Sequence, residues 1–90
     1  MEEKFLAALE ANRQKAASLG VRIRPVADMA QAKRVLSGSR CSDGFSLLSQ
    51  QAKLSLSLEA LAVDRRFTSL FTDDEANEAL NRLLEAGYRF

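Results

Sequence analysis

The chain has 90 residues, of which 47% are hydrophobic and 28% charged, so it has enough apolar material for one folded domain and too few residues for two independent cores. It contains no histidine and one cysteine, which excludes an internal disulfide, triads of the Ser-His-Asp or Cys-His kind, and most zinc sites. The net charge of +1 is far from that of a dedicated nucleic-acid binder, although residues 1–40 carry eight basic and four acidic side chains. We therefore expect a single helical domain over residues 1–90 with a basic N-terminal part.

The first predicted element is an amphipathic helix over residues 2–19. Acidic residues begin it and Gly20 follows its last turn, as expected because the helix dipole favours acids at the start and glycine enters the left-handed conformation easily. Its apolar residues at helical spacing, which we expect to face the core, are Phe5, Leu9, Ala16 and Leu19.

The next segment, residues 21–26, alternates apolar and basic side chains, a pattern typical of a short β-strand. Pro25 cannot donate a hydrogen bond, so a strand here would be brief or lie at an edge, and an extended connection along a helical core fits equally well. Helical spacing returns over residues 27–37, where Asp28 is suited to cap the start of a second helix. The Ser- and Gly-rich residues 37–44 that follow predict a loop.

The middle of the chain is ambiguous between helix and strand. Residues 54–58 alternate leucine and serine with the period of a strand, whereas the Leu, Ala and Gln content around them favours helix. We predict a helix over residues 45–53, a break at which Ser55 or Ser57 acts as an N-cap, and a further helix to residue 63.

The C-terminal helix has the clearest start signal. Residues 72–75 read Thr-Asp-Asp-Glu, a capping box in which the Thr hydroxyl and the Glu carboxylate satisfy free backbone amides, and Gly87 ends the helix. The apolar residues predicted on one face are Ala76, Leu80, Leu83 and Leu84. Residues 65–71 are predicted to be helical or irregular. Together these elements predict a mainly α fold, a compact bundle of four or five helices, either with or without a minor short β element near residues 21–26.

The basic segment, residues 13–40, contains Asp28 as its sole acid and is the candidate surface for an anion or nucleic acid. A chain with one basic and one acidic part can instead satisfy these charges within its own fold or in a dimer. The candidate contact residues are Arg13, Lys15, Arg22, Arg24, Lys33, Arg34 and Arg40.

A second candidate contact consists of Arg65 and Arg66 beside Phe67, because arginine and aromatic residues are enriched at interfaces between proteins. The alternative is a solvated turn in which an arginine pairs with Asp64 or Asp73 and the phenylalanine belongs to the core.

The sequence predicts no catalytic, metal or cofactor site. Cys41 has neither a histidine nor a second cysteine to activate it, so we expect an inert thiol. The acids at residues 73–78 lack the spacing of an EF-hand loop and coincide with a helix start, where they are locally favourable. We accordingly expect a protein that is not an enzyme.

Binding remains the expected type of function. The acidic N-terminus is unlike a signal peptide and no apolar run has the length of a membrane span, which predicts a cytoplasmic protein without membrane contact. The leading hypothesis is a small interaction module, an adaptor or regulator that binds a protein partner or a second copy of itself as a homodimer. The alternative is a DNA-binding transcriptional regulator that uses residues 13–40.

Overall fold

The computed structural model describes residues 1–38 and 40–88. Within these ranges the elements are α1 (Glu2–Ser18), α2 (Met29–Ser37), α3 (Phe45–Gln50), η1 (Leu54–Leu56), α4 (Leu58–Ala62), η2 (Thr68–Leu70) and α5 (Asp73–Glu85), where η denotes a short 3₁₀ turn. The radius of gyration over Cα atoms is 11.7 Å, so the mainly α fold and the compact bundle are confirmed.

The β element considered for residues 21–26 is not formed, because no strand occurs in the described ranges. These residues connect α1 to α2 without regular secondary structure. An isolated strand has no ladder to join, and Pro25 removes one of its donors, which explains why the alternation of side chains does not produce a sheet.

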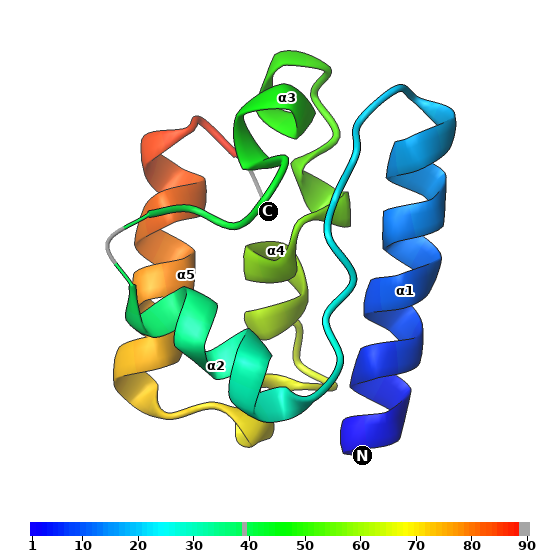
Figure 1. Cartoon of the computed structure of the whole chain (residues 1–90). Helices are drawn as coiled ribbons and strands as arrows, with labels where there is room; N and C mark the ends of the chain where they lie inside the picture. Colours follow the sequence, from blue (N-terminus) through cyan, green and yellow to red (C-terminus); the bar gives the residue numbers. More distant parts are fainter. Residues whose placement is uncertain (39, 89–90) are drawn as a thin grey trace.

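The central element of the bundle is α4. In Figure 1 it lies between α1 on one side and the pair α2 and α5 on the other, with α3 above it. Helix α5 packs against both α4 and α2. In the core beside α4, the Phe5 ring from α1 meets the rings of Phe67 and Phe71 edge to face, each with a centroid separation of 5.3 Å.

Side-chain caps fix three of the helix starts. Asp28 accepts a hydrogen bond from the Gln31 N–H at 2.9 Å, so the helix expected from residue 27 begins at Met29. Ser57 caps α4, and Thr72 and Glu75 form the predicted capping box of α5. The local sequence therefore determines where these helices begin.

The middle of the chain is more broken than the prediction. The helix expected over residues 45–53 ends at Gln50, followed by Ala52 with a left-handed φ of 58°. Residues 54–58 form η1 and the start of α4 rather than a strand. Helix α3 ends in a turn in which Ala52 is left-handed and the Lys53 N–H donates back to the Leu48 carbonyl at 2.8 Å. Ser57 then separates η1 from α4, because its hydroxyl donates to the Leu54 carbonyl at 2.6 Å and accepts from the Ala60 N–H at 3.1 Å.

Two leucines assigned to buried faces lie at the surface instead. Leu19 follows the last turn of α1 and is 40% exposed, and Leu84 on α5 is 54% exposed. The side chain of Arg82 is buried on α5 instead. Charge alone therefore does not identify the outward face of this helix.

Candidate functional site

The connection between α1 and α2 is an extended segment at the surface of the bundle. Figure 1 shows it returning along α1, in front of α4, from the C-terminal end of that helix towards the N-terminal end. A helix with the 17 residues of α1 is about 25 Å long, so the shorter connection must be extended to run along it. Its side chains alternate as in a strand: Val21 is buried, Ile23 is half-buried, and Arg22 and Arg24 are exposed.

The backbone of this extended segment is poorly partnered. Among the described residues, residues 22–27 make no hydrogen bond to another backbone group. The Arg24 N–H donates to Asp43 Oδ2 at 2.8 Å, and the Ala27 N–H donates to the Gln31 side-chain oxygen at 2.9 Å. The other backbone groups of the segment have no protein partner in the described ranges, as on the open edge of a sheet.

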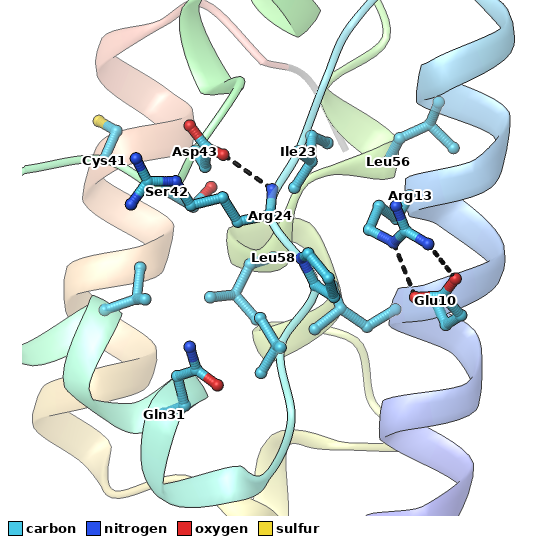
Figure 2. Close-up of a pocket in the computed structure, with 14 residues that line it drawn as sticks. Glu10, Arg13, Ile23, Arg24, Gln31, Cys41, Ser42, Asp43, Leu56 and Leu58 are labelled. Atoms are coloured by element: carbon cyan, nitrogen blue, oxygen red, sulfur yellow. Dashed lines mark hydrogen bonds and ion pairs between the residues drawn. The ribbon is translucent and has the colours of Figure 1, made fainter.

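A groove lies beside this segment and has a volume of about 340 Å³, within the usual range for ligand sites. In Figure 2 the segment crosses between Glu10 and Arg13 of α1 on one side and Gln31, Ser42 and Asp43 on the other. The apolar lining is contributed by α1, the segment, α2 and the residues around η1: Leu9, Ile23, Pro25, Val26, Val35, Leu56 and Leu58. We call this cavity the α1–α2 groove.

Two arginines lie on the rim of the α1–α2 groove, one in an ion pair and the other without one in the described part of the chain. Arg13 donates through Nε to Glu10 at 2.7 Å, and this hydrogen bond, helped by Gln14, lowers the pKa of Glu10 to about 2. The Arg24 side chain extends towards Cys41 and makes no ion pair within the described part of the chain (Figure 2). Arg24 therefore provides a positive charge at the groove that is available to a ligand.

A buried ion pair supports the loop that lines the groove at Ser42. Glu59 is fully buried and Arg82 is 5% exposed, and their charged atoms lie 3.2 Å apart. Glu59 also accepts hydrogen bonds from the backbone N–H and the hydroxyl of Ser42, at 2.8 and 2.5 Å. Burial alone would lower the pKa of Arg82, but its bonds to Glu78 and Glu59 outweigh burial and raise that pKa, so the guanidinium stays charged.

The same guanidinium also closes the C-terminal end of α2. Its NH1 and NH2 groups donate to the backbone carbonyls at this end, those of Val35, Leu36 and the C-cap Gly38. Arg82 thus joins α5 to α2 and, through Glu59, to the loop at Ser42. The sequence reading missed this pair; the available signal was a single glutamate within the apolar run Leu58–Ala62.

The seven candidate anion contacts are only partly brought together. Arg13 pairs with Glu10, and Lys33 Nζ lies 3.8 Å from Glu75 Oε1, while Arg13 and Arg24 share the groove. The remaining candidates are exposed and have no ion pair among the described residues; together with Arg24 they are Lys15, Arg22, Arg34 and Arg40.

In the second candidate contact, Arg65 and Arg66 lie at the surface, whereas Phe67 lies in the core. Arg66 forms an ion pair with Asp64 at 3.1 Å, which also lowers the pKa of Asp64, and its guanidinium lies 4.9 Å from the centre of the Phe67 ring. Phe67 itself is buried against Phe5, so its ring is not on the surface. Arg65 alone of the three is exposed without an ion pair in the described ranges.

Cys41 lies at the edge of the groove and is exposed. Partial burial of its thiol group and the nearby negative charge of Glu59 raise the pKa of Cys41, the opposite of what activates a nucleophile. Across residues 1–38 and 40–88, no group of three or more His, Cys, Asp or Glu side chains is placed to hold a metal ion.

Comparison of the chain with models of protein families, with curated proteins and with solved structures gives no match. None of the helices in the described ranges combines the length and the apolar character needed to cross a membrane. The α1–α2 groove and its surroundings are therefore the basis for a proposed function.

Proposed function

We propose that this protein is a small, non-enzymatic, cytoplasmic interaction module, an adaptor or regulator that binds a segment of a partner protein in the α1–α2 groove. The observation that carries the proposal is the combination of an apolar groove with an exposed, poorly partnered stretch of backbone along it. Such a combination suits a peptide chain, because a peptide supplies both apolar side chains and backbone hydrogen-bonding groups.

The test is selection from a random-peptide library on the purified protein, followed by NMR of the isotope-labelled protein with an enriched peptide. We expect the amide signals of residues 22–24, 26 and 27 and of the other groove-lining residues to shift, and those of the distant α5 N-terminus to stay in place. A selection that enriches no peptide over a protein-free control, or shifts confined to other elements, would refute the proposal.

The partner in this proposal includes a second copy of the chain. Leu19, Leu47 and Leu84 are large apolar side chains exposed at the surface, and a second copy that covers them would bury their apolar area. Light scattering over a concentration series measures it directly: a mass that rises towards the dimer supports a homodimer, and a constant monomer mass excludes it.

A second candidate function, DNA binding by residues 13–40, is favoured by the basic side chains without ion pairs: Lys15, Arg22, Arg24, Arg34 and Arg40. It predicts binding to duplex DNA that weakens steeply with salt, and a further loss when Arg22, Arg24 and Arg34 are replaced by alanine. Absence of binding at a low salt concentration of about 50 mM would refute it.

A further inference from the structure

We propose that the partner segment adds to the bundle as an extended strand alongside residues 22–27 and carries acidic side chains at alternate positions. This inference rests on the proposed function, since it names the chemistry of the segment that the α1–α2 groove would bind.

The backbone groups of the extended segment indicate which edge receives the strand. In an extended chain the N–H and C=O of one residue point to the same edge, and those of the next residue point to the opposite edge. Arg22 and Arg24 therefore share one edge, and the alternation ends there, because Pro25 is exposed and Val26 is half-buried. The Arg24 N–H donates to Asp43 Oδ2, so an added strand takes the place of this exposed carboxylate as the acceptor.

The α1–α2 groove extends along the edge that carries the Arg22 and Arg24 backbone groups. Gln31 of α2 and the loop residues Cys41, Ser42 and Asp43 line the cavity on the side away from α1 (Figure 2), and Val35 of α2 also lines it. The Arg22 N–H has no protein partner in the described ranges, and an added strand that displaces Asp43 from the Arg24 N–H would satisfy both groups. Affinity would then come from main-chain hydrogen bonds, which do not depend on the partner's side chains.

The charges of the segment specify which side chains that strand should carry. Arg22 and Arg24 are two residues apart, so both guanidinium groups lie on the outward side, and neither has an ion pair among the described residues. Opposite charges on neighbouring strands stabilise strand pairing. Glu10, the acid on the α1 rim, is already held by Arg13. Acids at alternate positions of the partner would face both free arginines.

The other side of the same strand would face the bundle. Its alternate side chains lie over the apolar lining formed by Ile23, Val35 and Leu58. The expected partner is therefore an extended segment in which acidic residues alternate with aliphatic ones. An alternating pattern matches a strand and not a helix, whose apolar residues recur every three or four positions.

The experiment uses the enriched peptides from the random library and two charge-reversal variants of the full chain. The double variant Arg22→Glu/Arg24→Glu changes the segment, and Lys4→Glu/Lys53→Glu is the control with the same net charge, because both lysines are exposed, do not line the groove and have no ion pair in the described ranges. Binding is measured by fluorescence anisotropy of a labelled peptide, of its Glu→Gln analogue and of a backbone N-methylated analogue.

We expect the enriched peptides to alternate acidic and aliphatic residues, and the segment variant and both analogues to bind at least about tenfold more weakly, while the control changes affinity less than about threefold. Enriched peptides that shift the groove signals but bind the Gln analogue or the segment variant with unchanged affinity would overturn this inference and leave the proposed function in place. A library that enriches no peptide would overturn both.

Discussion

The buried pair of Glu59 and Arg82 gives the sharpest test of how the groove is supported. We expect Arg82→Met to destabilise the domain by about 3–5 kcal/mol, the range found when one partner of a buried ion pair is removed. The substitution keeps an apolar side chain in the space but leaves the fully buried Glu59 without its cation and the carbonyls at the end of α2 without their donor. A loss of this size is a large part of the total stability of a small domain.

The matched control is Arg66→Met, which breaks an ion pair of similar geometry at the surface. The Arg66 side chain is 67% exposed and its bond to Asp64 spans 3.1 Å, so solvent screens the interaction and we expect a much smaller loss than for Arg82→Met. Both variants also lose an arginine and one positive charge, which removes the effect of net charge from the comparison.

The assay is urea unfolding followed by far-ultraviolet circular dichroism, with the free energy extrapolated to water. A second variant, Glu59→Gln, retains the shape of the side chain and tests the charge alone; combined with Arg82→Met it completes a double-mutant cycle. The reasoning is refuted if Arg82→Met costs no more than Arg66→Met, or if the two substitutions in the cycle are additive.

Three further outcomes follow from individual residues. Gly44→Ala should cost more than Gly87→Ala in urea unfolding, because both have a left-handed φ, which costs about 1–2 kcal/mol, but only at Gly44 would the new Cβ lie 2.8 Å from Ile23; equal losses would contradict this. The Glu10 carboxylate should titrate in NMR with a pKa near 2, so its stabilising contribution is present above the unfolded pKa of about 4.5 and is lost as the pH falls towards 2; a midpoint at 4.5 would show that the pair is not formed. Cys41 should alkylate with a more alkaline midpoint in the folded protein than in urea, because burial raises its pKa; a lower midpoint would contradict this.

Those parts of the fold that depend on neighbouring residues were predictable from the sequence. Asp28, Ser57 and Thr72 each act on a backbone amide three residues ahead; the caps at Asp28 and Thr72 were predicted, and Ser57 was one of the two serines considered for the third. The end of α3 at Gln50 was not predicted, because it depends on a left-handed conformation at Ala52, a residue type that does not signal such a turn.

The groove and its support could not be predicted, because they depend on contacts between distant residues. The bond between Arg24 and Asp43 spans 19 positions, and Arg82 meets Glu59 across 23. Periodicity assigned Leu84 to the core and gave no role to Arg82, because helical spacing does not show which neighbour covers each face. The basic character of residues 13–40 is evident from the sequence. Which of their basic side chains form ion pairs is not, because that depends on which acidic residues the fold brings near them.

The short helices in the middle of the chain have a consequence for how the domain opens. With six and five residues, α3 and α4 are far below the length at which an isolated helix is stable in water, so their amides are protected only while the surrounding core is intact. We expect amide hydrogen exchange in α4 to proceed by global unfolding, at the same rate as in the buried turns of α5, and not by local fraying. A bundle that opens as one unit would hold the walls of the α1–α2 groove in place until the whole molecule unfolds.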